Sequence, residues 1–198
     1  MGRKQKTFLQ LRKIGIYGGT FDPIHHAHLI LAREALELLH LEKVIFVPAA
    51  ISPFKDAPVA SAEMRLSMLK AAIKGEVGFS VHDRELGRES PSYTIDTVEE
   101  IRYSEGNAEI YCLIGEDNVA GLPSWHRFSE LEKMVQFIVL DRSGIQESHP
   151  FPTVRRKLDI SATDIRKRVA LGQSIRYLVP PAVEEIIGQG NLYREQVK

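Results

Sequence analysis

Two glycines and two histidines near the N-terminus form the most informative chemical pattern in the chain. They lie in the run Gly18-Gly19-Thr20-Phe21-Asp22-Pro23-Ile24-His25-His26-Ala27-His28. Because glycine has no Cβ, the backbone of such a loop can approach an anion closely. His25 and His28 are three residues apart, so in a first helical turn both rings share a face and can reach one phosphate. The run therefore predicts a phosphate-binding loop.

Other readings of this loop are weaker. It matches neither the G-x-G-x-x-G fingerprint of dinucleotide-binding proteins nor the G-x-x-x-x-G-K-[ST] motif of P-loop proteins. A metal site would need further ligands, and there is no H-E-x-x-H pattern and no cysteine nearby. The single cysteine, Cys112, lies in an apolar run and is expected to be buried and inert. We predict no metal site built by the protein itself.

Short apolar runs that alternate with longer helical patterns must position this loop. Such alternation predicts an α/β fold, a Rossmann-like doubly wound parallel sheet of about five or six strands. Ligands of these sheets bind beyond the carboxyl ends of the strands, where the glycine loop falls. Strands are expected at 14–17, 44–47, 79–82, 109–114 and 135–140, and helices at about 27–41, 61–74 and 94–104, with a helix pair at 118–133.

The last part of the chain, residues 161–198, is expected to form a small helical part. Ser161-Ala162-Thr163-Asp164 has the capping-box pattern that begins a helix. Gly172 is placed to end that helix, and Pro181 is placed to begin a final one.

The composition is that of a soluble globular protein, with 43% hydrophobic residues, 26% charged residues and a formal net charge of +0. A balanced charge provides no long-range attraction for a polyanion, so nucleic acid is not an expected partner. No run reaches the ~18 apolar residues that span a bilayer, and the basic tail at 1–12 lacks the apolar core of a secretory signal. We expect residues 1–198 to form one cytoplasmic domain, and a homo-oligomer is compatible with this sequence.

The glycine and histidine loop resembles the Gly-Gly-x-Phe-Asp-Pro-x-His-x-Gly-His signature of the nucleotidyltransferases related to class I aminoacyl-tRNA synthetases. The segment from Ile160 to Arg166 resembles that family's Ile-Ser-x-Thr-x-x-Arg segment. A helix start with a serine cap offers N–H groups to an anion, and Arg166 adds a planar, permanently charged donor. The resemblance implies a catalytic role for His25, His28 and Arg166. It implies that ATP is bound by Gly18, Gly19, Thr20, Phe21, His25, His28, Ser161 and Arg166.

Two further segments are similar to those of one branch of this family, the bacterial nicotinate-nucleotide adenylyltransferases. One is Pro91-Ser92-Tyr93-Thr94-Ile95-Asp96-Thr97, and the other is Ile114-Gly115-Glu116-Asp117 with Trp125 downstream. The resemblance runs from Ile14 to Tyr193, and it implies that Trp125 stacks on the pyridine ring. It implies that the mononucleotide is bound by Lys55, Thr94, Asp117, Trp125 and His126.

Two positions depart from the family pattern. Ala27 stands where the family usually has glycine, so the start of the helix must tolerate a methyl group near the nucleotide. Phe54 stands where histidine is usual in the loop that also carries Lys55. Lys55 remains available as a cation that faces phosphate.

The implied reaction transfers the adenylyl group of ATP to nicotinate mononucleotide in NAD biosynthesis, giving deamido-NAD and pyrophosphate. Because the attacking phosphate is already ionised, catalysis reduces to positioning and charge stabilisation, and Mg²⁺ is expected to enter with ATP. The nearest alternatives are adenylyltransferases that use nicotinamide mononucleotide or phosphopantetheine, and the Thr94 and Trp125 segments argue against the latter. A noncatalytic nucleotide-binding or RNA-binding module is the alternative from another class.

Overall fold

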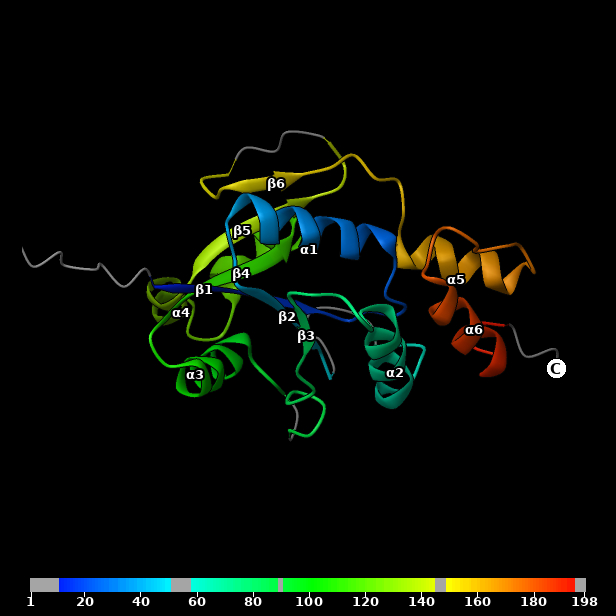
Figure 1. Ribbon diagram of the computed structural model, residues 1–198, viewed down its shortest axis with the longest axis horizontal. Coiled ribbons are helices and arrows are strands. Elements are labelled where there is room, and N and C mark those ends of the chain that lie inside the picture. The colour runs from blue at the N-terminus through cyan, green and yellow to red at the C-terminus, as the bar shows by residue number, and fades with distance from the viewer. Residues whose placement is uncertain (1–10, 51–57, 89–90, 145–148, 195–198) are drawn as a thin grey trace, which may run out of the picture.

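Strands rich in valine and isoleucine build one parallel sheet in the computed structural model, which describes residues 11–50, 58–88, 91–144 and 149–194. The strand order is β3-β2-β1-β4-β5-β6 (Figure 1). This order confirms the Rossmann-like α/β fold, and its winding reverses between β1 and β4, where such sheets bind ligands. The strands are β1 (Arg12–Gly19), β2 (Lys43–Pro48), β3 (Phe79–Val81), β4 (Ala108–Gly115), β5 (Gln136–Asp141) and β6 (Thr153–Arg155).

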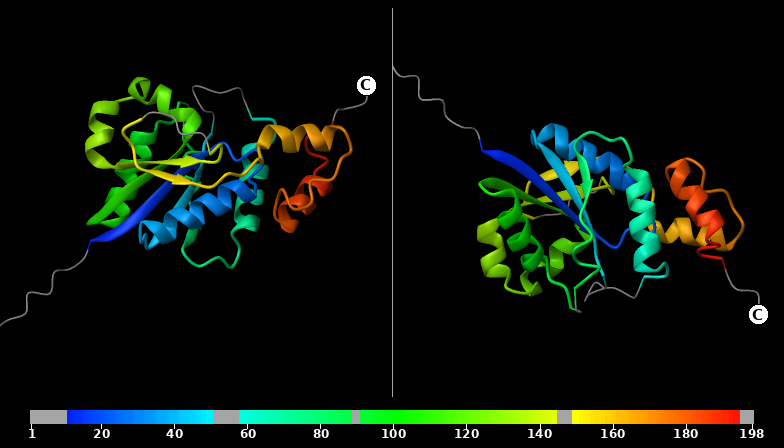
Figure 2. Two further views of the ribbon diagram at one scale, coloured as in Figure 1. Left: turned by 90° about the horizontal axis from the view of Figure 1, so that it is seen from above. Right: turned by 60° about the horizontal axis from the view of Figure 1, so that its bottom comes forward.

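Helices cover both faces of the sheet (Figures 1 and 2). Side chains alternate along β1, so Ile14 and Ile16 pack into one core while Tyr17 packs into the other. The core on the Tyr17 side includes residues of α1 (His26–Leu38), α2 (Ala62–Ala72), α5 (Ala162–Ala170) and α6 (Pro181–Gln189). The opposite core includes residues of α3 (Thr94–Glu105) and α4 (Phe128–Met134).

Two elements differ from the sequence-based expectation. Strand β6 was not predicted, because only Val154 is buried between two exposed polar residues and no apolar run marks the strand. The first half of the helix pair predicted at 118–133 is the 3₁₀ helix η1 (Glu116–Ser124), which contains Pro123. Proline removes a backbone donor and crowds the preceding turn, so a regular α-helix does not run through it.

Helix α5 begins and ends, and helix α6 begins, where the sequence predicted. The Ser161 side chain caps α5 by accepting a hydrogen bond from the Asp164 N–H at 3.1 Å. Gly172 follows α5 with a φ of +68°, and Pro181 is the first residue of α6. Both helices lie at the end of the molecule next to α2 (Figure 2). None of the helices that the structure describes is long and apolar enough to cross a membrane.

Candidate active site

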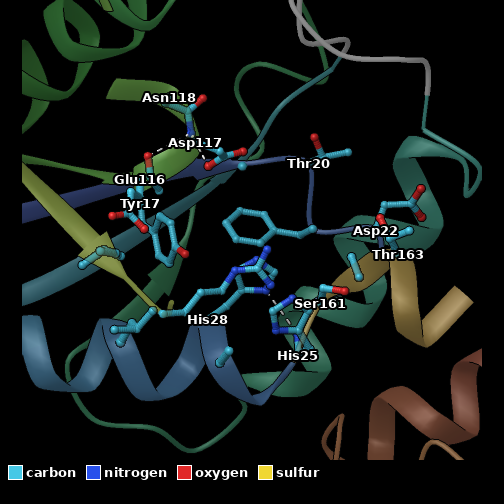
Figure 3. A pocket seen from close by; sticks show the side chains of 18 of the residues that line it. Tyr17, Thr20, Asp22, His25, His28, Glu116, Asp117, Asn118, Ser161 and Thr163 are labelled. Atoms are coloured by element: carbon cyan, nitrogen blue, oxygen red, sulfur yellow. Dashed lines mark hydrogen bonds between the residues drawn. The ribbon is translucent and has the colours of Figure 1, made fainter. Parts of the chain in front are cut away.

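A cavity of ≈ 980 Å³ lies at the carboxyl ends of β1 and β4, at the point where the winding of the sheet reverses (Figure 3). Strand β1 contributes the glycine loop to its wall, β4 contributes Gly115, and α5 contributes residues of its first two turns. The fold therefore joins two motifs that lie far apart in the sequence. The cavity is lined by all the residues predicted to bind ATP: Gly18, Gly19, Thr20, Phe21, His25, His28, Ser161 and Arg166.

The glycine loop is shaped by the ring of Phe21. Phe21 is buried with a φ of +48°, and its ring packs edge-on against Tyr17 and His28, with centroids 5.5 and 5.2 Å away. A Cβ on Gly19 would lie 2.9 Å from this ring, so a larger residue at position 19 would force the Phe21 ring to move. A Cβ on Gly18 would meet no atom within 4 Å. Gly18 thus leaves its backbone open to the cavity, as an anion-binding loop requires.

His25 and His28 form a stacked pair at the start of α1 (Figure 3). Their ring centroids are 3.7 Å apart with an angle of 16° between the planes. The His25 backbone N–H donates to Nδ1 of His28 at 3.3 Å, which fixes the second ring. The two rings therefore lie together as expected, although His25 is the extended N-cap residue and not part of the first helical turn, and both side chains line the cavity.

Burial keeps His25 neutral. The residue is only 2% exposed, and desolvation, helped by the charge of Arg142, lowers the pKa of His25 to about 3. A neutral imidazole still carries one N–H donor. His25 can therefore donate a hydrogen bond to a phosphate oxygen without adding a fixed positive charge.

We expect this depressed pKa to make the fold less stable in acid. Unfolded His25 gains a proton below pH ~6.5, whereas folded His25 resists protonation down to its pKa of about 3. The associated stability is fully present above the unfolded pKa and is lost as the pH falls toward the folded pKa. Urea unfolding at several pH values should show a flatter dependence in His25→Asn than in the wild type. Equal slopes in the two proteins would contradict a buried, neutral His25.

Arg166 brings a permanent positive charge to the cavity wall. It donates to the Asp22 carbonyl oxygen at 2.7 Å, which ties α5 to the glycine loop. Arg142, directly after β5, is a second cation at this cavity, and it donates to the Ile160 carbonyl. Sequence reasoning missed Arg142 because a single arginine after a strand carries no motif.

Arg65 was also missed, since it belongs to an ordinary helical pattern in α2. Its side chain is 1% exposed and donates to three backbone carbonyl oxygens. These belong to Thr20 at 2.8 Å, Ala49 at 2.7 Å and Ala50 at 3.2 Å. The guanidinium therefore holds the glycine loop against the segment that follows β2.

The predicted pyridine-binding residues lie on the α3 and α4 side of the sheet and do not line this cavity. Thr94 is the first residue of α3, and Trp125 follows η1 with its ring edge-on to Phe137 at 6.3 Å. His126 stacks on Tyr93, the neighbour of Thr94, with centroids 4.1 Å apart. The structure thus brings the Thr94 and Trp125-His126 segments to each other, as a shared binding role requires.

The structure places the other residues singled out from the sequence in different locations. Asp117 lines the cavity beside the predicted ATP-binding residues rather than lying with Thr94 and Trp125. Ala27 is 1% exposed and also lines the cavity, so its methyl group is accommodated in the wall. Lys55 and Phe54 lie outside the described residues.

Comparisons with known proteins agree with this geometry. Residues 16–168 match the family model described as cytidylyltransferase-like. The chain is 43% identical over 185 residues to a probable nicotinate-nucleotide adenylyltransferase of Geobacillus thermodenitrificans, covering 91% of this chain and 86% of that protein. It is also 43% identical over 186 residues to a protein of the same name from Exiguobacterium sibiricum, covering 91% of this chain and 98% of the relative.

The fold has counterparts among solved structures. The Plasmodium falciparum nicotinic acid mononucleotide adenylyltransferase complexed with NaAD superposes with a TM-score of 0.78 at 22% identity, covering 94% of this chain and 100% of that one. This likeness supports the architecture, and the family follows from the closer sequence relatives. The chain belongs to the nicotinate-nucleotide adenylyltransferases, within the cytidylyltransferase-like nucleotidyltransferase family.

Proposed function

We propose that this protein, working as a single nucleotidyltransferase domain, transfers the adenylyl group of ATP to nicotinate mononucleotide and so produces deamido-NAD and pyrophosphate. The observation that carries the proposal is the cavity in which the open glycine loop, the paired histidines and Arg166 face the same space. Backbone N–H groups, imidazole donors and a guanidinium are together suited to a polyphosphate. The names of the sequence relatives point to the same reaction.

In the proposed reaction, an oxygen of the mononucleotide phosphate attacks the α-phosphorus of ATP. A new P–O bond forms, the bond to the bridging oxygen breaks, and pyrophosphate leaves with that electron pair. His25 and His28 donate hydrogen bonds to the phosphoryl group being transferred, and Arg166 binds the departing phosphates. No protein nucleophile or general base is needed, because the attacking phosphate is already ionised near neutral pH.

The acceptor is proposed to extend from the cavity to the region where the start of α3 lies next to Trp125-His126. Thr94 and the backbone at Trp125-His126 hold the pyridine carboxylate, and the Trp125 ring stacks on the heterocycle. Asp117, which lies on the cavity side, is an acceptor-only carboxylate suited to a sugar hydroxyl of the mononucleotide. Lys55 remains a prediction as a further phosphate contact.

Mg²⁺ is proposed to enter with ATP. No group of three or more His, Cys, Asp or Glu side chains suited to a metal ion lies within the described ranges of the chain. Glu116, a hard oxygen donor, stands in the cavity wall and would contact water molecules bound to the metal. When bound, the ion neutralises phosphate charge.

The test is an acceptor panel with purified protein. Pyrophosphate release is measured with MgATP and, in turn, nicotinate mononucleotide, nicotinamide mononucleotide, phosphopantetheine or no acceptor, and the nucleotide product is identified by mass. We expect release and a deamido-NAD product with nicotinate mononucleotide, and little release with phosphopantetheine or without acceptor. ATP binding without release in any reaction would instead favour a noncatalytic nucleotide-binding module.

A further inference from the structure

The carboxylate of Asp22 is a buried junction between three segments of the chain. It follows the glycine loop, is 3% exposed, and accepts three hydrogen bonds. One oxygen accepts from the Val59 N–H at 2.7 Å, and the other accepts from the Ala60 N–H at 3.2 Å and the Tyr193 hydroxyl at 2.6 Å. Val59 and Ala60 precede α2, whereas Tyr193 lies beyond α6.

This junction borders the cavity directly. Asp22 and Val59 both line it, and the Asp22 backbone carbonyl accepts the hydrogen bond from Arg166. A buried carboxylate is costly unless its oxygens are satisfied, so its donors must stay in place together. Moving one donor is therefore expected to disturb the glycine loop, the part of the cavity wall formed by Val59, and the hydrogen bond from Arg166 to the Asp22 carbonyl oxygen.

Tyr193 is suited to keep the Asp22 carboxylate in place. It is 9% exposed, and its ring belongs to the same core as α2 and α6. Burial, together with the hydrogen bond to Asp22, raises the pKa of Tyr193. The hydroxyl therefore remains protonated and continues to donate at neutral and mildly alkaline pH.

We propose that Tyr193 is a positioning residue, which acts through Asp22 to fix the glycine loop and the Val59 wall for adenylyl transfer. The C-terminal helical part is thus a component of the active site, because it supplies the hydroxyl as well as Arg166. The kinetic side of this proposal rests on the proposed function, whereas its structural side does not.

Tyr193→Phe tests the proposal because it removes the hydroxyl and keeps the buried ring. Tyr177→Phe is the matched control, since Tyr177 lies in the same C-terminal part but is 78% exposed. Amide hydrogen exchange, followed residue by residue by NMR, should become roughly 10-fold faster at Val59 and Ala60 in Tyr193→Phe. Amides in the middle of β1 and β4 should keep their wild-type rates, and the control should change neither set.

Steady-state kinetics provide the second measurement. A displaced loop weakens contacts that matter most in the transition state, so kcat should fall by roughly 10-fold with a smaller change in the KM for ATP. Asp22→Asn, which places an NH₂ group among three donors, should accelerate exchange at the same two amides. Unchanged exchange at Val59 and Ala60 in both variants, or equal acceleration throughout the sheet, would overturn the proposal. The exchange result stands even if the acceptor panel shows no adenylyl transfer, so the two proposals fail separately.

Discussion

Replacing His28 with alanine is expected to lower kcat by a factor on the order of 10²–10³, the usual cost of removing one preorganised donor from a developing negative charge. The His28 ring is held in place by the His25 backbone N–H and by stacking at 3.7 Å, so in the proposed role it would meet the phosphoryl group without reorganising. Its contact strengthens as charge shifts in the transition state, so ATP binding should weaken far less. Steady-state kinetics with a separate measurement of ATP affinity check this expectation.

His26→Ala is the matched control. His26 occupies the same first turn of α1, but it is absent from the described residues that line the cavity. Its kcat should remain within about 2-fold of the wild type, as expected for a residue that does not touch the reacting atoms. His25→Ala should resemble His28→Ala, because both rings of the stacked pair face the cavity. Equal losses in kcat and in ATP affinity for His28→Ala would show that the ring binds substrate and transition state alike.

Most of the fold was predictable because its signals are local. Near-continuous apolar runs such as 135–140 marked strands that are covered on both faces, and the actual strand, β5, begins one position later. Ser161, Gly172 and Pro181 marked helix ends through backbone chemistry that does not depend on distant contacts. The short edge strand β6 was not predicted. It is a strand because it pairs with β5, and its own three residues contain no apolar pattern that would mark one.

Only those parts of the site that lie in sequence motifs could be predicted. The glycine loop and the Ser161–Arg166 segment were recognisable, and the fold brings both to one cavity. Asp22 was visible in the motif, but its partner Tyr193 and the clamp by Arg65 depend on tertiary contacts. Neither a tyrosine after a helix nor an arginine within one has a sequence spacing that reveals which carbonyl or carboxylate it will contact.

Nicotinate mononucleotide is expected to be preferred over nicotinamide mononucleotide by a factor on the order of 10⁴ in kcat/KM, as sites built around one hydrogen-bond pattern can achieve. Thr94 begins α3, and Tyr93 at the N-cap makes no side-chain hydrogen bond to the first turn. We therefore expect the N–H groups of that turn to be available to a carboxylate, which the helix dipole also favours. An amide would turn its own NH₂ donors toward these N–H groups, which leaves buried donors unpaired.

Two variants separate recognition of the ring from recognition of its substituent. Trp125→Ala should lower kcat/KM for both mononucleotides by a similar factor, because stacking depends on the flat heterocycle and not on the group attached to it. Thr94→Val keeps the shape of the side chain and removes its hydroxyl, so it should reduce the preference for the acid more than it reduces use of the amide. Competition assays that contain both mononucleotides measure the ratio directly. Equal use of the two by the wild type would contradict the assigned acceptor and leave the transfer chemistry at the histidine pair intact, because the acceptor segments lie apart from the cavity that holds that pair.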